Sequence, residues 1–264
     1  GDFQWKTIIN FVDNNNKVLE VGTATPDALD GGFGDTRAVP GFPVSTNFIV
    51  RWSRINPETG RPIYFTRGGE ETDVYSVVEN RVAAGSPAPD FTGGITNTFS
   101  YKKLSLSALL VFVSGGTIYD DAAKRHLGVV TQDWNMRREV LDRWQVPGDV
   151  SSVPRLTRSM INWGGNANFW QNNHSLWLED ASYMRLRNLA LSYDFGKVES
   201  LNLDRVVLTF AGNNLFTWTN YSGIDPEVAR DRTTAGQRNI GGTNITYLTA
   251  PQEKSYNLTL RVDF

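Results

Sequence analysis

The residues of this chain that could carry out catalysis are few and scattered. Two carboxylate pairs stand out, Asp120 with Asp121 and Asp225 with Glu227. A hydrolase needs two carboxylates that face each other across a substrate, and neighbours in sequence do not provide that arrangement. The two histidines lie far apart and the chain has no cysteine, so neither a metal site nor thiol chemistry is expected. We therefore expect a protein that is not an enzyme, with no catalytic residue, metal or cofactor.

Side chains suited to binding are more numerous. Tryptophans gather in and beside residues 120–177, where indole rings could stack on sugars or peptides or contact another protein. The alternative is that they pack loops together or form an aromatic girdle at a membrane interface. Arg185 and Arg187 lie two positions apart, so on a strand they share a face, where they could contact a ligand or form ion pairs within a wall. The candidates for ligand contact are Trp134, Trp144, Trp163, Trp170, Arg185 and Arg187.

The elements that would position these side chains are β-strands, and the last residues show this most clearly. In residues 255–264 every even position is apolar and every odd position is polar. Side chains alternate across a strand, so this segment has one apolar face and one polar face. Its length is close to the roughly 9–11 residues with which a tilted strand crosses a bilayer. The segment is therefore predicted to be a membrane-crossing strand.

The same alternation recurs along the chain, and the connections between the strands differ in length. Further strands are predicted at residues 1–11, 44–53, 91–101, 104–113, 176–195 and 206–218. Residues 102–103 make one tight turn and residues 196–204 another short connection. Long loops are expected around 56–90, 120–176 and 220–250. Short turns at one end and long loops at the other are typical of outer-membrane β-barrels.

Two local departures from the strand pattern are predicted. Within residues 176–195 the apolar positions change parity near Asn188, which indicates a β-bulge. Residues 120–144 are charged, contain no proline and have one glycine, Gly128. This composition predicts helix inside the longest connection.

The overall composition fits a membrane barrel better than a helical membrane protein. Hydrophobic residues make up 40% of the chain and the mean hydropathy is -0.35. No apolar run approaches the roughly 18 residues of a membrane helix. A membrane β-barrel contains no such run, because its lipid-facing and lumen-facing residues alternate along each strand. Aromatic residues reach 12%, which suits interface girdles. The net charge of -2 gives no indication of nucleic-acid binding.

Several segments of the chain resemble segments of one protein family. Residues 178–188 (LEDASYMRLRN) are similar to the family's "EDGSYLRLRN" segment, and residues 213–227 to its "QNLFTWTKYSGYDPE" segment. Residues 91–101 resemble its "FTGGLTNTFSYK" strand. The departures are small: Ala181 stands where Gly is usual, and Asn213 where Gln is usual. The matches follow the family's order and together cover nearly all of the chain. The family that the chain resembles is the SusC/RagA-type TonB-dependent transporters.

The resemblance implies a fold and a function. Residues 1–264 would be an all-β segment, the C-terminal part of an antiparallel transmembrane β-barrel. They would supply about seven to eight of its roughly 22 strands, the size of plugged outer-membrane transporters. No plug-domain segment is recognised in this chain. The implied activity is energy-dependent import of glycans or peptides across the bacterial outer membrane.

The resemblance also implies partners. These are a SusD-like surface lipoprotein that acts as a lid, the TonB complex acting through the plug, the remaining barrel and outer-membrane lipid. Arg185 and Arg187 would line the lumen and contact substrate or plug, or form a salt-bridged wall. Phe264 resembles the terminal aromatic residue that is read during barrel assembly.

Two other classes of protein remain open at this point. A small autonomous outer-membrane barrel, acting as an adhesin or an enzyme, would contain a complete, even set of strands within this chain. A soluble carbohydrate-binding β-domain would need no detergent and would bury the end of the chain in a sandwich core. The ordered family segments favour the transporter over both.

Overall fold

The computed structural model describes most of the chain. The described residues are 2–23, 36–128, 135–155, 173–227, 245–246 and 249–264. Among them, no helix is long and apolar enough to cross a membrane.

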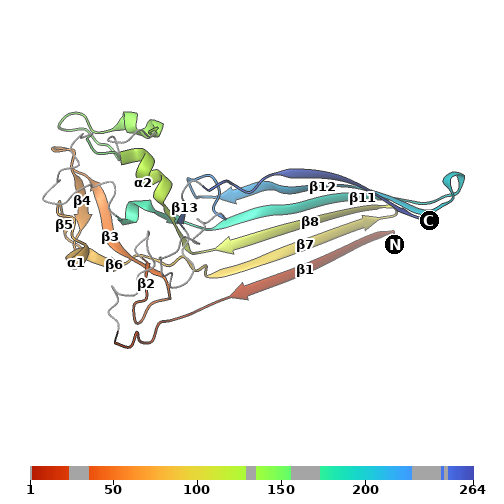
Figure 1. The fold of residues 1–264 in the computed structure, drawn as a ribbon, viewed down its shortest axis with the longest axis horizontal. Helices are drawn as coiled ribbons and strands as arrows, with labels where there is room; N and C mark the ends of the chain where they lie inside the picture. Colours follow the sequence, from red (N-terminus) through yellow and green to blue (C-terminus); the bar gives the residue numbers. More distant parts are fainter. Residues whose placement is uncertain (1, 24–35, 129–134, 156–172, 228–244, 247–248) are drawn as a thin grey trace.

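Six long strands form one antiparallel sheet in the order β1-β7-β8-β11-β12-β14. They are β1 (Phe3–Asp13), β7 (Phe91–Tyr101), β8 (Leu104–Ser114), β11 (Tyr183–Val198), β12 (Leu203–Thr219) and β14 (Ser255–Asp263). The strands run side by side along the long axis of the molecule, and both ends of the chain lie at the same end of the sheet (Figure 1). The smaller elements gather at the opposite end, which we call the loop end (Figure 1). The predicted difference between short turns and long loops is therefore present.

The register of the sheet gives it two chemically different faces. One row of cross-strand partners crosses all six strands and is apolar: Trp5, Phe99, Leu106, Leu191, Phe210 and Leu258. A neighbouring row on the opposite side is polar: Gln4, Ser100, Ser105, Ser192, Thr209 and Thr259. We call the two sides the apolar face and the polar face. Trp5 is 64% exposed and Leu258 71% exposed, as expected for side chains that meet lipid rather than a protein core.

A β-bulge in β11 keeps the apolar face continuous toward the loop end. The register shifts between Leu186 and Asn188 in the pairings with both neighbouring strands, as the change of parity predicts. Relative to β8 the extra residue is Arg187, so Leu186 pairs with Leu110 on the apolar face. Relative to β12 the extra residue lies on β12, between Asn213 and Phe216. Arg185, next to Leu186, is thereby turned to the polar face.

The strand predicted at residues 44–53 exists but does not belong to the large sheet. It is β3 (Thr46–Ile55), which pairs with short strands of the loop end. Ile49 and Val50, which point to opposite sides of β3, are both fully buried, so neither face meets lipid. The described part of the large sheet thus has six strands rather than seven to eight. The connection before β7 begins after β1, not near residue 56.

The other elements of the loop end are short. They are β2 (Thr36–Arg37), β4 (Pro62–Phe65), β5 (Glu71–Thr72), β6 (Arg81–Ala83), β9 (Thr117–Asp120), β10 (Leu178–Asp180), β13 (Ile245–Thr246), α1 (Val77–Asn80), α2 (Asp121–Gly128), and the 3-10 turns η2 (Arg138–Asp142) and η4 (Ser175–Trp177). We call these elements together with β3 the loop platform. A further 3-10 turn, η5 (Glu199–Leu201), joins β11 to β12 at the other end. The helix predicted within residues 120–144 is confirmed by α2.

The hydrophobic core lies in the loop platform rather than under the large sheet. Its buried residues are Val50, Tyr64, Tyr119, Ala123, Val153 and Trp177. They come from β3, β4, β9, α2 and the segments that follow, so residues far apart in sequence share one core. A barrel wall has lipid on one side and water on the other, and therefore supplies no comparable core of its own.

Candidate functional site

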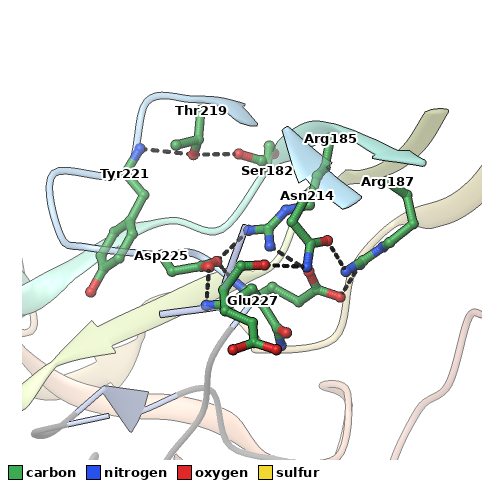
Figure 2. Close-up of polar contacts among 10 residues, drawn as sticks. Ser182, Arg185, Arg187, Asn214, Thr219, Tyr221, Asp225 and Glu227 are labelled. Carbon is green, nitrogen blue, oxygen red and sulfur yellow. Dashed lines mark hydrogen bonds and ion pairs between the residues drawn. The ribbon is translucent and has the colours of Figure 1, made fainter. Parts of the chain in front are cut away.

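Arg185 anchors the loop after β12 to the polar face of the sheet. Its side chain is almost completely buried, and its guanidinium forms ion pairs with Asp225 and with Glu227, the latter at 3.2 Å from Nη1 to Oε2. Figure 2 shows both carboxylates turned toward the arginine. The two acidic residues sit in the segment that follows β12, so one side chain of β11 fixes the start of a long loop.

Arg187 extends this ion-pair cluster. As the extra residue of the bulge, it ion-pairs with Glu227 and donates from Nη1 to Asn214 Oδ1 at 2.9 Å (Figure 2). Asn214 has a φ of 53°, in the left-handed region that asparagine tolerates better than most residues. Its Nδ2 donates to the Glu253 carbonyl at 2.9 Å, which connects the cluster to the segment before β14.

Asp225 is held in its ionised form. Burial on its own would raise the pKa of this carboxyl, but three interactions outweigh burial and leave the pKa below its usual value. They are hydrogen bonds from the Glu227 and Gln252 backbone N–H groups, at 3.0 Å and 2.9 Å, and the interaction with Arg185, which donates a hydrogen bond and carries the opposite charge. Asp225 thus forms the turn that its position before a proline predicts, and it also takes part in the ion-pair cluster.

Further polar contacts lock the loops to one another. The Tyr221 hydroxyl lies 2.8 Å from Thr246 Oγ1, and Ser222 donates from both N–H and hydroxyl to the Glu179 carboxylate at 2.8 Å and 2.7 Å. Burial is the main cause that raises the pKa of Tyr221 to about 12, so its hydroxyl stays protonated at any physiological pH. These contacts therefore connect the loop that follows β8 to the loop that follows β12.

A buried histidine lies in the aromatic core of the loop platform. His174 stacks on Trp52 with ring centroids 5.3 Å apart and lies 5.2 Å from Trp177 and 5.8 Å from Tyr64. Burial, assisted by the nearby charge of Lys124, lowers the pKa of His174 to about 3. The ring is therefore neutral at physiological pH and packs as an aromatic side chain.

The tryptophans proposed for ligand contact have different outcomes. Trp144 is buried, donates from Nε1 to the Pro57 carbonyl at 2.7 Å, and packs its ring against Gly60, whose φ is +65°. It therefore joins two loops. Trp134, Trp163 and Trp170 lie outside the described residues.

Phe264 follows β14 and is 91% exposed, and its role as an assembly signal stays a prediction.

The sequence did not single out the pair formed by Asp120 and Arg137. Asp120 is buried at the start of α2, and Arg137 Nη2 lies 3.3 Å from its Oδ2. Asp120 Oδ1 accepts the Ala123 N–H at 2.8 Å, a helix-capping contact. The two partners are separated by a helix and a turn, so no spacing in the sequence indicates that they meet.

Comparison with known proteins identifies the architecture. No family model matches the chain. TonB-dependent receptors P26 and P3 of Formosa agariphila are 28% and 26% identical to it over 285 and 298 residues, covering 100% of this chain and 27% of each relative. The RagAB peptide transporter structure superposes with a TM-score of 0.79 at 23% identity, over 100% of this chain and 27% of that one. The chain has the fold of a TonB-dependent transporter barrel.

The same fold recurs in a second solved structure, the RagAB peptide importer in the "closed-closed" state, with a TM-score of 0.78. These comparisons confirm the resemblance to SusC/RagA-type transporters and the predicted outer-membrane location. The chain spans about a quarter of the length of the relatives it matches. Within such a barrel, the apolar face of the sheet meets lipid and the polar face lines the interior.

Proposed function

We propose that this chain forms part of the wall and the loop platform of a TonB-coupled importer. The importer carries glycans or peptides across the outer membrane. Energy would come from TonB, acting through a plug domain; the support is that two relatives are named TonB-dependent receptors. The observation that carries the proposal is that the whole chain matches the RagAB transporter fold with a TM-score of 0.79.

The geometry supports a channel wall with a fixed rim. The polar face carries small hydroxyl and amide side chains, which suits a water-filled interior. At the loop end of this face, Arg185 and Arg187 are engaged by Asp225 and Glu227. We propose that the two arginines shape the rim by holding the loop after β12, and that cargo contacts are made by the surfaces they position.

A surface lipoprotein of the SusD type is the proposed lid. The support from this chain is three exposed apolar side chains within residues 141–150: Leu141 at 65%, Val146 at 57% and Val150 at 97% exposure. Exposed apolar groups rimmed by polar residues are typical of protein–protein contact sites. Trp134, Trp163 and Trp170 belong to the same long connection and remain candidates for contact with the lid or the cargo.

Catalysis has no support among the described residues. The carboxylates that come closest to an enzyme's acid and base are already engaged, Asp120 by Arg137 and the helix N-terminus, and Asp225 by Arg185. The relatives are named as receptors and transporters. We therefore propose a transport role without a chemical step.

Uptake by whole cells tests this proposal. Cells carrying the full-length transporter and its lid would be given fluorescent oligopeptides or fluorescent oligosaccharides, with and without TonB. We expect one of the two cargo classes to accumulate only when transporter and TonB are both present. Accumulation that is the same without TonB, or that is absent for both classes, would contradict the proposal.

A further inference from the structure

A cavity of about 310 Å³ lies between helix α2 and the loop after β12. The residues that line it include Asp120, Ala122, Arg137, Tyr221, Ile224 and Asp225. Its volume is at the lower end of the range for small-molecule sites, roughly 300–1,000 Å³. It could hold one amino-acid residue or one sugar unit, but not a whole oligomer.

The two carboxylates that line the cavity already have hydrogen-bond and ion-pair partners. Asp120 accepts the Ala123 N–H with Oδ1 and pairs with Arg137 through Oδ2. Asp225 pairs with Arg185 and accepts backbone N–H groups with both oxygens. Neither carboxylate therefore offers an open position for a cation.

Arg137 is the group with spare hydrogen-bonding capacity. Its one side-chain contact within the described part of the chain is Nη2 to Asp120 Oδ2, at 3.3 Å. This distance exceeds the roughly 2.7–2.9 Å of a strong arginine–carboxylate hydrogen bond. Nη1 and Nε donate to no residue in the described ranges, and the side chain is 30% exposed. A guanidinium with two spare donors at a cavity wall is suited to a planar anion such as a carboxylate.

We propose that this cavity binds a carboxylate carried by the cargo, with the Arg137 guanidinium as the anion-binding group. Tyr221 and Ile224 would pack against the apolar part of the same cargo unit. The carboxylate could be the C-terminus of a peptide or the acid group of a uronic sugar. That the ligand is cargo rests on the importer proposed above, whereas the carboxylate site itself rests on the cavity and on Arg137.

Binding to the purified full-length transporter in detergent tests the site. N-acetyl-leucine would be compared with N-acetyl-leucinamide, and glucuronate with glucose, by calorimetric titration. We expect at least one acid to bind about tenfold or more tightly than its uncharged counterpart, the range expected for a hydrogen bond to a charged group. If both acids bind no better than the neutral compounds, the proposal is wrong. The acid that binds identifies the source of the carboxylate.

Two variants and a control assign the effect to this cavity. Arg137→Gln should abolish the preference for the acid, and Ala122→Leu should weaken acid binding by filling the cavity while leaving the Asp120–Arg137 pair in place. Arg138→Gln, an exposed arginine next in the chain, should bind as the parent does. Unchanged acid binding in Ala122→Leu, with an unchanged protease-resistance pattern, would refute the site.

The outcome is separable from that of the importer proposal. A parent transporter that shows no acid preference but intact TonB-dependent uptake would refute only the carboxylate site. Acid binding without any TonB-dependent uptake would refute only the importer.

Discussion

Removing the guanidinium of Arg185 should release the loop that follows β12. Arg185→Met keeps most of the apolar stem and removes the charge that Asp225 and Glu227 share. Breaking a buried ion pair from one side typically costs about 3–5 kcal/mol. Glu227 is one-quarter exposed and keeps Arg187 as a partner, so the lower end of that range applies here. We expect about 3 kcal/mol, which corresponds to roughly 100-fold in the equilibrium between closed and open loop.

Amide hydrogen exchange on the full-length transporter reads this equilibrium directly. The Glu227 and Gln252 N–H groups donate to Asp225, so their exchange should accelerate by about the same 100-fold if opening is rapid and reversible. Arg205→Met is the matched control. Its partner is Asp194 on the same pair of strands, but the two side chains are 52% and 32% exposed, and exposed pairs contribute only about 0–1 kcal/mol. Equal exchange at Glu227 in the two variants would refute the anchoring role of Arg185.

Three further predictions concern other parts of the chain. The pKa of His174 is about 3 in the folded protein and about 6.5 in an unfolded chain. The neutral ring therefore contributes its full stability above pH 6.5, and this stability is lost as the pH falls toward 3, by up to about 1.4 kcal/mol per pH unit. Protease resistance of the loop platform should fall over this pH range, and it should fall less in His174→Phe. Gly60→Ala should destabilise the loop platform more than Gly148→Ala. Both glycines have a positive φ, but only at position 60 would the added methyl group meet an indole ring, that of Trp144. Equal rates of proteolysis in the two variants would contradict this prediction. Leu258→Arg should destabilise the barrel by about 2–4 kcal/mol if it lies near the bilayer midplane, whereas Thr259→Arg should be tolerated, as measured by the heat-modifiable folded fraction on gels.

The large sheet could be predicted from the sequence because each of its faces meets one solvent. Lipid selects apolar side chains at Leu258 and Phe210, and water selects polar ones at Thr259, so alternation records the environment of every strand. The bulge was also predictable, because a change of parity without a change of environment requires an extra residue. Arg187 supplies that residue.

The loop platform could not be predicted in the same way. The alternation of β3 resembles that of a membrane strand, but Ile49 and Val50 are both fully buried because protein covers β3 on both sides. Its neighbours are distant in sequence: the Trp52 N–H donates to Ser175 Oγ across 123 positions. Alternation identifies a strand but not the partner that covers it.

The ion-pair partners of Arg185 and Arg187 could be predicted from the sequence only in part. A charged residue on a strand near a loop end indicates a need for compensation, and the acidic residues Asp225 and Glu227 in the next loop are the obvious source. That both converge on Arg185 depends on the path of the loop after β12, which no periodicity records. The Asp120–Arg137 pair beside the proposed anion site could not be predicted for the same reason, because it also depends on the path of a loop.

We propose that the six-stranded sheet is the wall of a transport channel, with lipid on its apolar face and water on its polar face. Its most direct test uses single cysteines at Leu258 and Thr259, which are consecutive on β14 and belong to the two faces. This chain contributes no cysteine of its own, and any cysteine elsewhere in the transporter would be replaced. A fluorophore at each position would be exposed to a lipid-dissolved nitroxide quencher and to aqueous iodide in proteoliposomes. We expect quenching by the lipid probe at position 258 and by iodide at position 259. The same response at both positions would show that the two faces do not meet different solvents.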